Sequence, residues 1–546
     1  MRRIKAHRWI HVWLILLPAA VICASPADRV DRPGWQRREV NWPITAVGRV
    51  KAINYPQGRC PPLAYEQVGG RPPRPQKAAL ETEGPVRVAP LTMEAADPIV
   101  AAVVDSPALG GFLSWITVTA TDERSGELEL DAIPSNSVIG NHLTPTPQTD
   151  YAIAVFDTGA TTHVMGITDA ARLGLVDHSL ITSNIVQMMG VTGVVNALVS
   201  QPLGVFIDGL AAIDPNGLLL DESAMVGQTN VSIIVGDPVE SPDLLTTIGT
   251  PLSVYLAAVI RNDRPITITH DGTKLLAPDI RFYAHDDPDV PSYGSKIPLE
   301  LRPLGAAAVQ YFPNIFDPFD PDFGAPLSPS VITGFLPTQS LFFVSSVDLT
   351  DGGRSAVDKD GFMFDTGSTY TFVSEPIGAR LGLNPNAPEF ELEILIATGG
   401  TITAPGYYID SLDLVATPQW LRFTNVPVFV FDAPSPEGGI LDGIIGTNLF
   451  VDFNLVFRGG GLPGQAQPRL EFERIPLRLT GDIAPDGGDG VVDFLDMAAL
   501  SEAWLTNSES FNWNPRADMA PPRPDGMVNL FDLAALAEHW LQAAAP

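Results

Sequence analysis

The sequence predicts a mostly β protein made of two similar lobes, followed by a small helical domain at the C-terminus. Two observations predict this fold. A long segment of the chain occurs twice, and both copies consist of short runs rich in Val, Ile, Thr and Phe, separated by Gly, Pro and Asp. With 546 residues, of which 45% are hydrophobic and 18% charged, the chain is long enough for about two to four domains that each bury a core.

The internal duplication sets the predicted architecture. Residues 157–175 align without a gap on residues 365–383, and both copies begin with Asp-Thr-Gly and end with Ala-Arg-Leu-Gly-Leu. An Ile-Gly-Thr element at 248–250 is repeated at 445–447. The order of features is thus kept over about ninety residues in each half, which predicts two lobes that face one another.

Both halves indicate mainly antiparallel β-sheet, because β-branched and aromatic residues favour strands. We expect strands over 113–121, 232–235, 341–349, 428–431 and 450–457. Helical patterns are short, and we expect helices over 168–173 and 375–381.

The charge balance argues against nucleic acid as a partner. The chain has 33 Lys+Arg and 63 Asp+Glu, a net charge of -30 and a pI near 4.5. Binding a polyanion requires clustered Lys and Arg that release counterions, and this surface would repel it. An acidic extracellular setting or cation binding suits such a composition better.

Residues 1–25 have the pattern of an export signal. Four basic residues precede an apolar run over 9–22, and small residues follow it. The run is too short to span a bilayer, so we favour cleavage over a retained anchor and expect a secreted or cell-surface protein without a stable membrane span. Of the two cysteines, Cys23 and Cys60, only Cys60 would remain after cleavage, which excludes an intramolecular disulfide.

A basic, Pro-rich leader follows over residues 26–95. Residues 26–87 hold 11 Lys+Arg and 6 Asp+Glu, whereas the rest of the chain after them is strongly acidic. Long-range attraction would hold such a leader, or propeptide, against the acidic body. A flexible spacer with incidental charge is the alternative, and the sequence does not decide between them.

The repeated Asp-Thr-Gly motif suits hydrolysis without a metal or a covalent nucleophile. Such a reaction needs one group to activate a water and another to protonate the leaving amide. Two carboxyl groups within hydrogen-bond reach cannot both ionise, so they share a proton and supply one base and one acid. We therefore interpret Asp157 and Asp365 as a catalytic pair, and the sequence does not assign which is the base.

The residues that follow each Asp are predicted to support the catalytic loops. They are Thr158, Gly159, Ala160, Thr366, Gly367 and Ser368. The threonine hydroxyls can tie one turn to the other lobe, and the glycines permit a tight turn. The small third residues leave room for the water, and Ser368 can also hydrogen-bond its carboxylate.

These motifs resemble the active-site signature of the pepsin and retropepsin superfamily of aspartic peptidases. Ile444-Ile445-Gly446 is similar to the element of two hydrophobic residues and Gly behind each catalytic loop, and Thr247-Ile248-Gly249 is its counterpart. The Ala-Arg-Leu-Gly-Leu endings resemble the retropepsin-like subgroup, in which two single-lobe chains dimerise. The resemblance covers about residues 100–475. It implies a pepsin-like pair of double-ψ β-barrels with a cleft between them, in a monomeric unit that cuts protein or peptide substrates without a catalytic cofactor.

We therefore expect a peptidase body in three parts: an N-terminal lobe over 96–262, a connection or insertion over 263–335, and a C-terminal lobe over 336–476. Residues 263–335 have no counterpart that we can place.

In the family a β-hairpin flap closes over the substrate. The segment expected to form it here, 188–193, lacks the Tyr that the pepsin branch uses.

A second, shorter repeat with a period of 36 residues occupies the C-terminal domain over 480–546. Each copy is an acidic, Gly-containing loop followed by an amphipathic helix with Leu and Trp. Clustered Asp and Asn oxygens are the ligands that calcium prefers. The candidate ligands are Asp482, Asp489, Asp493 and Asp496 in the first loop, and Asp518, Asp525, Asn529 and Asp532 in the second.

This repeat resembles the duplicated EF-hand-like loop and helix of dockerin modules, which bind calcium and dock onto cohesin partners. Both loops are three residues longer than the usual spacing, through 484–488 and 520–524. A merely acidic helical hairpin is the alternative to a calcium site. A self-contained domain or a surface-anchoring tag is the alternative to a cohesin-like partner.

His163, beside the first motif, reads as a packing or surface residue rather than a ligand, and Thr371 occupies its position in the second copy. The sequence holds no HExxH, paired CxxC, P-loop, dinucleotide-type Gly motif or GxSxG.

The predicted function is therefore a secreted aspartic endopeptidase localised by a calcium-binding module. The alternative is an inactive scaffold of the same fold, attached to a surface assembly through that module.

Overall fold

The computed structural model describes residues 10–15, 51–53, 102–121, 143–144, 149–302 and 341–542. Short gaps inside these ranges fall at 191–192, 215–217, 223, 240, 243, 286, 396–400, 436–438, 461–465, 476–479, 485–489, 508–509, 511 and 521–524. Most of the predicted export signal and leader, residues 303–335 of the predicted insertion, and Asp489 lie outside the described residues.

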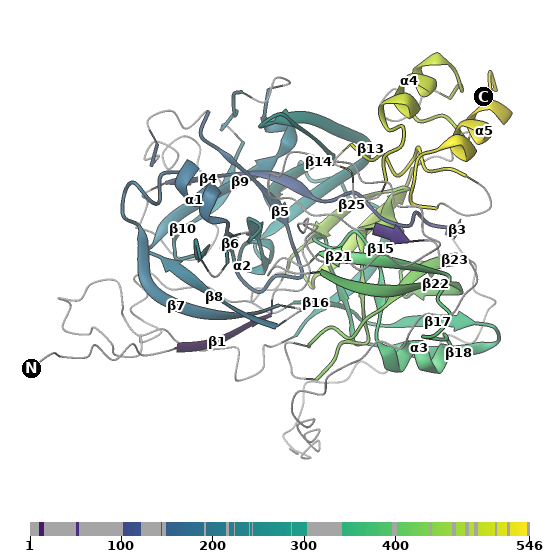
Figure 1. Cartoon of the computed structure of the whole chain (residues 1–546), viewed down its shortest axis with the longest axis horizontal. Coiled ribbons are helices and arrows are strands. Elements are labelled where there is room, and N and C mark those ends of the chain that lie inside the picture. The colour runs from purple at the N-terminus through teal and green to yellow at the C-terminus, as the bar shows by residue number, and fades with distance from the viewer. Residues whose placement is uncertain are drawn as a thin grey trace, which may run out of the picture.

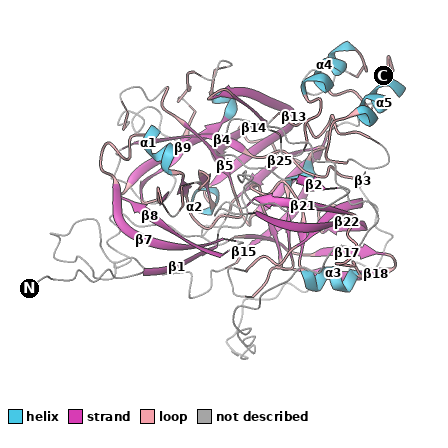
Figure 2. Cartoon of the chain, viewed as in Figure 1, coloured by secondary structure: helices cyan, strands magenta, loops and turns pink. Residues whose placement is uncertain are grey.

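The described residues confirm a mostly β chain with two large sheets, each carrying one copy of Asp-Thr-Gly (Figures 1 and 2). The first sheet has ten strands in the order β1-β7-β8-β11-β6-β12-β5-β4-β9-β10. Their bounds are Ile10–Ile15 (β1), Trp115–Thr121 (β4), Ala152–Phe156 (β5), Val164–Met165 (β6), Ile181–Gly190 (β7), Gly193–Ser200 (β8), Leu203–Gly209 (β9), Val226–Val231 (β10), Ile234–Gly236 (β11) and Thr247–Ile248 (β12).

The second sheet runs in the order β14-β13-β25-β26-β15-β16-β19-β24-β20-β23-β22-β17-β18, with β21 and β3 also paired into it and β2 paired on β21. The bounds are Lys51–Ile53 (β2), Ala102–Asp105 (β3), Leu256–His270 (β13), Thr273–Ala284 (β14), Ser295–Leu301 (β15), Phe342–Val344 (β16), Val347–Asp351 (β17), Arg354–Lys359 (β18), Phe362–Phe364 (β19), Phe372–Val373 (β20), Phe390–Leu395 (β21), Thr401–Leu414 (β22), Leu421–Val430 (β23), Gly443–Ile445 (β24), Phe453–Arg458 (β25) and Arg469–Arg474 (β26).

The two sheets repeat one topology. In the first, the path β4-β5-β12-β6-β11-β8-β7 alternates antiparallel and parallel pairs until it ends in the β7–β8 hairpin. In the second, β16-β19-β24-β20-β23-β22-β21 has the same senses of pairing in the same order. The duplicated sequence therefore folds into duplicated structure. Of the predicted flap segment 188–193, the described residues 188–190 end β7 and residue 193 begins β8, with Gly190 opposite Gly193.

Each Asp-Thr-Gly strand leads into a short helix at the expected place. These helices are α1 (Ile167–Arg172) and α3 (Glu375–Leu381). Helix α3 begins where the Ser374 side chain accepts a hydrogen bond from the Ile377 amide, and it ends at Gly382, whose φ of 82° is left-handed. A third short helix, α2 (Thr250–Ser253), follows the first Ile-Gly element.

The lobes are joined by a shared group of strands. The long hairpin β13–β14 comes directly after the first lobe, and β13 pairs with β25 of the second half. Residue 262, the predicted end of the first lobe, therefore lies inside β13. Strand β3 likewise precedes the first lobe in the chain but pairs with β23 of the second. The chain thus crosses between the lobes more often than a simple two-part division predicts.

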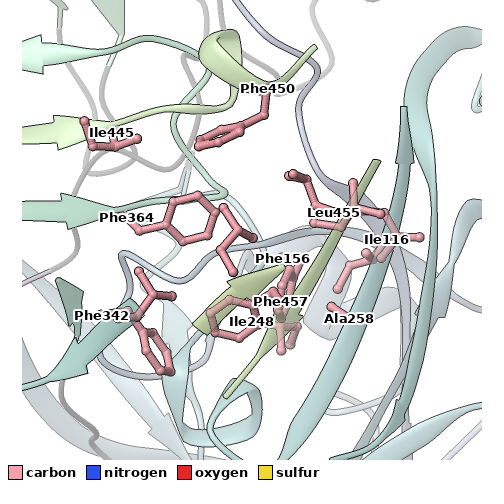
Figure 3. Packing of buried hydrophobic residues seen from close by; sticks show 14 of the residues in the cluster. Ile116, Phe156, Ile248, Ala258, Phe342, Phe364, Ile445, Phe450, Leu455 and Phe457 are labelled. Carbon is pink, nitrogen blue, oxygen red and sulfur yellow. The ribbon is translucent and has the colours of Figure 1, made fainter. Parts of the chain in front are cut away.

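A cluster of buried aromatic rings fills the space between the lobes (Figure 3). Phe156 precedes the first Asp and Phe364 the second, and both rings contact Phe457 of β25. Phe342 meets the same ring edge-on, with centroids 4.8 Å apart. The core is therefore continuous from one Asp-Thr-Gly loop to the other.

The C-terminal repeat forms two helices, α4 (Phe494–Glu502) and α5 (Leu530–Glu538), which lie together beside the β13–β25 region (Figure 1). Their shared core includes Leu500, Trp513 and Leu536. Arg516 donates a hydrogen bond to the Asn262 carbonyl of β13, which ties this domain to the joining strands. Among the described residues, none of the helices has the length and apolar character needed to cross a membrane.

We expect Phe457→Ala to lower the free energy of unfolding by about 3–5 kcal/mol, because the ring is fully buried and its removal leaves a cavity between the lobes. Chemical denaturation followed by circular dichroism measures the loss. Val357→Ala, at a side chain that is 53% exposed, is the control and should change stability by less than about 0.5 kcal/mol. A loss below about 1 kcal/mol for Phe457→Ala would contradict this account of the core.

Candidate active site

The two Asp-Thr-Gly loops leave the ends of equivalent strands. Asp157 follows β5, and its amide donates to the Ile248 carbonyl at 3.0 Å. Asp365 follows β19, and its amide donates to the Ile445 carbonyl at 3.1 Å. Each Ile belongs to the short strand that pairs in parallel with the strand before the Asp. The Ile-Gly elements therefore fix the point at which each loop leaves its sheet.

The hydroxyls of Thr158 and Thr366 link the two loops directly. Thr158 Oγ1 accepts a hydrogen bond from the Thr366 amide at 3.1 Å and donates to the Phe364 carbonyl at 2.9 Å. Thr366 Oγ1 accepts from the Thr158 amide at 3.1 Å and donates to the Phe156 carbonyl at 2.6 Å. All four groups are buried, so each hydroxyl satisfies main-chain groups that would otherwise lack a partner.

The glycines of the two motifs show how closely the loops approach. A Cβ added at Gly159 would lie 2.6 Å from Cγ of Asp365, and one added at Gly367 would lie 2.6 Å from Cγ of Asp157. Each glycine therefore lies against the carboxyl group of the other lobe. Only a residue without a side chain permits this contact.

The two carboxyl groups have matching surroundings. The Gly159 amide donates to Asp157 Oδ1 at 2.7 Å, and the Gly367 amide donates to Asp365 Oδ1 at 2.8 Å. The Oδ2 atom of each carboxyl accepts no hydrogen bond from an amide or hydroxyl of the described residues, although both side chains are fully buried. A buried oxygen without a partner is costly, and a polar molecule between the carboxyl groups would satisfy both.

Burial is the largest cause of raised pKa values at both groups. It raises the pKa of Asp365 to about 6. The pKa of Asp157 is raised well above its ordinary value by burial, by the negative charge of Asp365 and by hydrogen bonding between the two carboxyl groups. The pair therefore takes up protons more readily than isolated carboxylates and can hold one proton between its members.

The remaining residues of the loops are placed differently from one another. Ala160 is fully buried, and its carbonyl accepts from the Thr250 amide. The Ser368 hydroxyl does not hydrogen-bond the carboxylate as the sequence suggested. Its Oγ donates to the Tyr370 carbonyl at 2.8 Å, because the turn places that acceptor two residues away. Sequence reasoning also missed Asn448, which accepts from the Thr371 hydroxyl at 2.7 Å and supports the second loop from behind.

In the C-terminal domain, the candidate calcium ligands have structural partners. Asp496 accepts hydrogen bonds from the amides of Ile483, Ala484 and Asp493, and Asp532 accepts from those of Met519, Ala520 and Asn529. Asp493 and Asn529 cap helices α4 and α5. Asp496 and Asp532, the last candidate ligand of each loop, therefore connect the start of their loop to the start of the helix.

The first Asp of each loop accepts from the loop glycine: Asp482 from the Gly490 amide and Asp518 from the Gly526 amide. Burial, followed by the charges of Asp525 and Asp532, raises the pKa of Asp518 to about 8. A cation would relieve this accumulation of negative charge, so the second loop fits one electrostatically. Nevertheless, no group of three or more His, Cys, Asp or Glu side chains arranged to hold a metal occurs within the described part of the chain.

Residues 350–449 match a protein-family model described as Aspartyl protease. The second Asp-Thr-Gly motif and Gly446 lie inside this match. This match lies within the second lobe. The second lobe is therefore similar to the aspartyl protease family. No curated protein matches the chain.

Distant similarities to solved structures also occur. The structure of EDGP matches with 10% identity and a TM-score of 0.28, over 66% of this chain and 95% of that one. Conglutin gamma, a basic 7S globulin from lupine seeds, matches with 11% identity, 66% and 96% coverage and a TM-score of 0.28. Basic 7S globulin from soybean matches with 10% identity, 66% and 94% coverage and the same TM-score.

We expect Thr158→Val to destabilise the protein by roughly 1–3 kcal/mol for each of the two buried main-chain groups that lose their partner. The side chain keeps its shape, so the loss reports the hydrogen bonds alone. Chemical denaturation measures it. Thr350→Val, which removes a hydroxyl paired only with Ser411 between β17 and β22, is the control and should cost less than about 1 kcal/mol. Equal losses in the two variants would contradict the proposed link between the loops.

Proposed function

We propose that this chain is an aspartic endopeptidase in which Asp157 and Asp365 activate a water molecule for attack on a peptide bond. One observation carries the proposal: two buried carboxyl groups from different lobes lie close enough to interact, and each has one oxygen held by a glycine amide and a second that accepts from no amide or hydroxyl of the described residues. A water between these second oxygens can lose a proton to one carboxyl group while the other protonates the amide nitrogen. The match of residues 350–449 to an aspartyl protease model supports the same class of reaction.

The pKa shifts define the pH range of this chemistry. Asp365, with a pKa of about 6, is protonated below that pH, and the raised pKa of Asp157 favours a second proton on the pair in acid. The pair then has no base. Once the first proton is lost, the proton that remains serves as the acid and the ionised carboxyl group as the base. We therefore expect activity to rise toward neutral pH.

Substrate access requires motion, because neither catalytic Asp exposes any surface. The two hairpins β7–β8 and β21–β22 occupy equivalent positions in the lobes. By analogy with the flaps of the family, we propose that they open for the substrate. Strand β1 pairs with β7, and β2 pairs with β21, so both outer hairpin strands carry a segment from the N-terminal region.

We expect Asp157→Asn and Asp365→Asn each to reduce cleavage of a denatured protein by about 10²–10⁴-fold, because each removes one of the two proton-transfer groups. The cleavage rate, measured from pH 3 to 8, should be greatest above about pH 6 in the unaltered protein. A statine-type transition-state mimic should block it.

Asp208→Asn is the matched control. Asp208 is a buried carboxyl group of the first lobe whose pKa is also raised, to about 6, mainly by burial, but it lies outside the pair. This variant should keep activity within a few-fold. A rate that peaks below about pH 4 would contradict the raised pKa values of the pair. A chain that binds a partner through its C-terminal domain and cuts nothing across this pH range would instead be a scaffold of the same fold.

We further propose that the C-terminal domain binds calcium through its second loop and localises the exported protein by docking onto a cohesin-like partner. Asp518 and Asp525 supply the side-chain oxygens, with main-chain carbonyls or water completing the shell. Asp532 Oδ1 already accepts two hydrogen bonds from amides, and Oδ2 accepts one. Only one acceptor position, on Oδ2, is therefore left for a cation. The main task of Asp532 is to clamp the loop.

If calcium binds there, it should raise the unfolding temperature of the C-terminal domain, and a chelator should lower it. Calorimetric titration should show that Asp525→Asn weakens the affinity by about tenfold or more, since it removes one of few charged ligands. Glu538→Gln, at an exposed acidic residue on α5, is the control and should bind as the unaltered protein does. Unfolding that ignores both calcium and chelator would identify the domain as a metal-free helical hairpin.

A further inference from the structure

His163 lies behind the first catalytic loop and makes two hydrogen bonds with its ring. The side chain is buried, with 1% of its surface exposed. The Gly249 amide donates to Nδ1 at 3.1 Å, and Nε2 lies 3.0 Å from Oε1 of Gln228. An amide can only donate, so Nδ1 must be the unprotonated nitrogen and Nε2 carries the hydrogen. These contacts require the neutral ring.

Gly249 belongs to the Ile-Gly element that fixes the position of Asp157. A Cβ at this residue would lie 2.4 Å from the Thr162 carbonyl and 2.5 Å from the Ala160 carbonyl. The neighbouring Ile248 carbonyl accepts from the Asp157 amide. A shift of Gly249 therefore also moves Ile248, whose carbonyl holds the Asp157 amide.

In the second lobe, the amide of the equivalent glycine, Gly446, is held by groups that do not titrate. Thr371, the counterpart of His163, accepts from the Gly446 amide at 3.3 Å and donates to Asn448 Oδ1 at 2.7 Å. In the first lobe, the position of Asn448 is taken by Pro251, which has no side-chain amide. Gln228 of β10 supplies the amide instead, and its Nε2 donates to the Pro251 carbonyl at 2.8 Å. The two lobes therefore differ in chemistry at one equivalent site.

We propose that His163 is a positioning residue that holds the first catalytic loop only in its neutral form, so that acid releases this loop while the second stays in place. On protonation, Nδ1 becomes a donor and faces the Gly249 amide, which is also a donor. A loss of peptidase activity in acid rests on the proposed function. The release of the first loop on protonation of His163 does not depend on that function.

The electrostatic surroundings support this behaviour. Burial lowers the pKa of His163 to about 4 from its ordinary 6.5, and the Gln228 hydrogen bond opposes the shift only in part. Those are the two causes of the shift. No charged side chain of the described residues contributes, and the groups at the ring nitrogens are the neutral Gln228 and the Gly249 amide.

The sign of the linkage follows from the lowered pKa. The unfolded chain binds a proton near pH 6.5 and the folded chain only near pH 4. The stabilisation from His163 is complete above pH 6.5 and is lost as the pH falls from 6.5 to 4. Across this window the folded-to-unfolded ratio should fall by about two to three orders of magnitude relative to a variant without the titrating ring. Asp365 changes stability in the opposite direction, so only the difference between variants isolates His163.

The experiment compares full-length protein with its His163→Asn variant, both carrying Asp157→Asn to prevent self-digestion. The Asn Oδ1 can take the place of Nδ1 as an acceptor, and it does not titrate. Unfolding by denaturant from pH 4 to 7 should show that the stability advantage of His163 shrinks as the pH falls. NMR of the ring nitrogens should show the Nε2–H form of His163 and no titration above about pH 5.

His178→Asn, at an exposed histidine of the same lobe, is the matched control and should leave the pH dependence unchanged. In protein with both Asp residues intact, a short incubation at pH 4 should reduce activity in the unaltered chain more than in His163→Asn. A His163 ring that titrates near pH 6.5, or a stability difference that is flat with pH, would overturn the proposal. Both of these readouts work in a protein without peptidase activity, so they separate this inference from the proposed function.

Discussion

The structure depends on the paired hydrogen bonds between Thr158 and Thr366. Each hydroxyl bonds an amide of the opposite motif and the carbonyl of the Phe that precedes the opposite Asp. These bonds bring two loops, separated by 208 residues in sequence, close enough for each Asp carboxyl to touch the glycine of the other motif. They also require both sheets to place equivalent strands at the interface, and the repeated pairing order of the two lobes does so.

Burial at this interface turns two ordinary carboxyl groups into a coupled pair. The Phe rings around Phe457 exclude water from behind the loops, and desolvation is the first cause of the raised pKa of each Asp. The glycine amides offset part of this cost at Oδ1, whereas Oδ2 accepts from no amide or hydroxyl of the described residues. The buried Oδ2 atoms therefore cost stability, and they are the atoms that the proposed reaction would use.

The sequence could predict the features that depend on repeated local patterns. The gapless alignment of 157–175 on 365–383 predicted the two lobes, and the helices at 168–173 and 375–381 appear as α1 and α3. It could not predict partners that are distant in sequence and lack a repeat. The β13–β14 hairpin and the return of β3 to the second lobe depend on tertiary pairing. Likewise, His163 read as a lone histidine, because Gln228 lies 65 residues away and nothing in the sequence connects them.

The central claim is that Asp157 and Asp365 share one proton. Carbon-13 NMR of the two labelled carboxyl groups, followed across pH, tests it most directly. The account predicts that the titrations of the two groups depend on each other, with both pKa values above that of an ordinary Asp, and that replacing either Asp by Asn changes the titration of the other. Two independent titrations near pH 4, each unaffected by the other replacement, would contradict it.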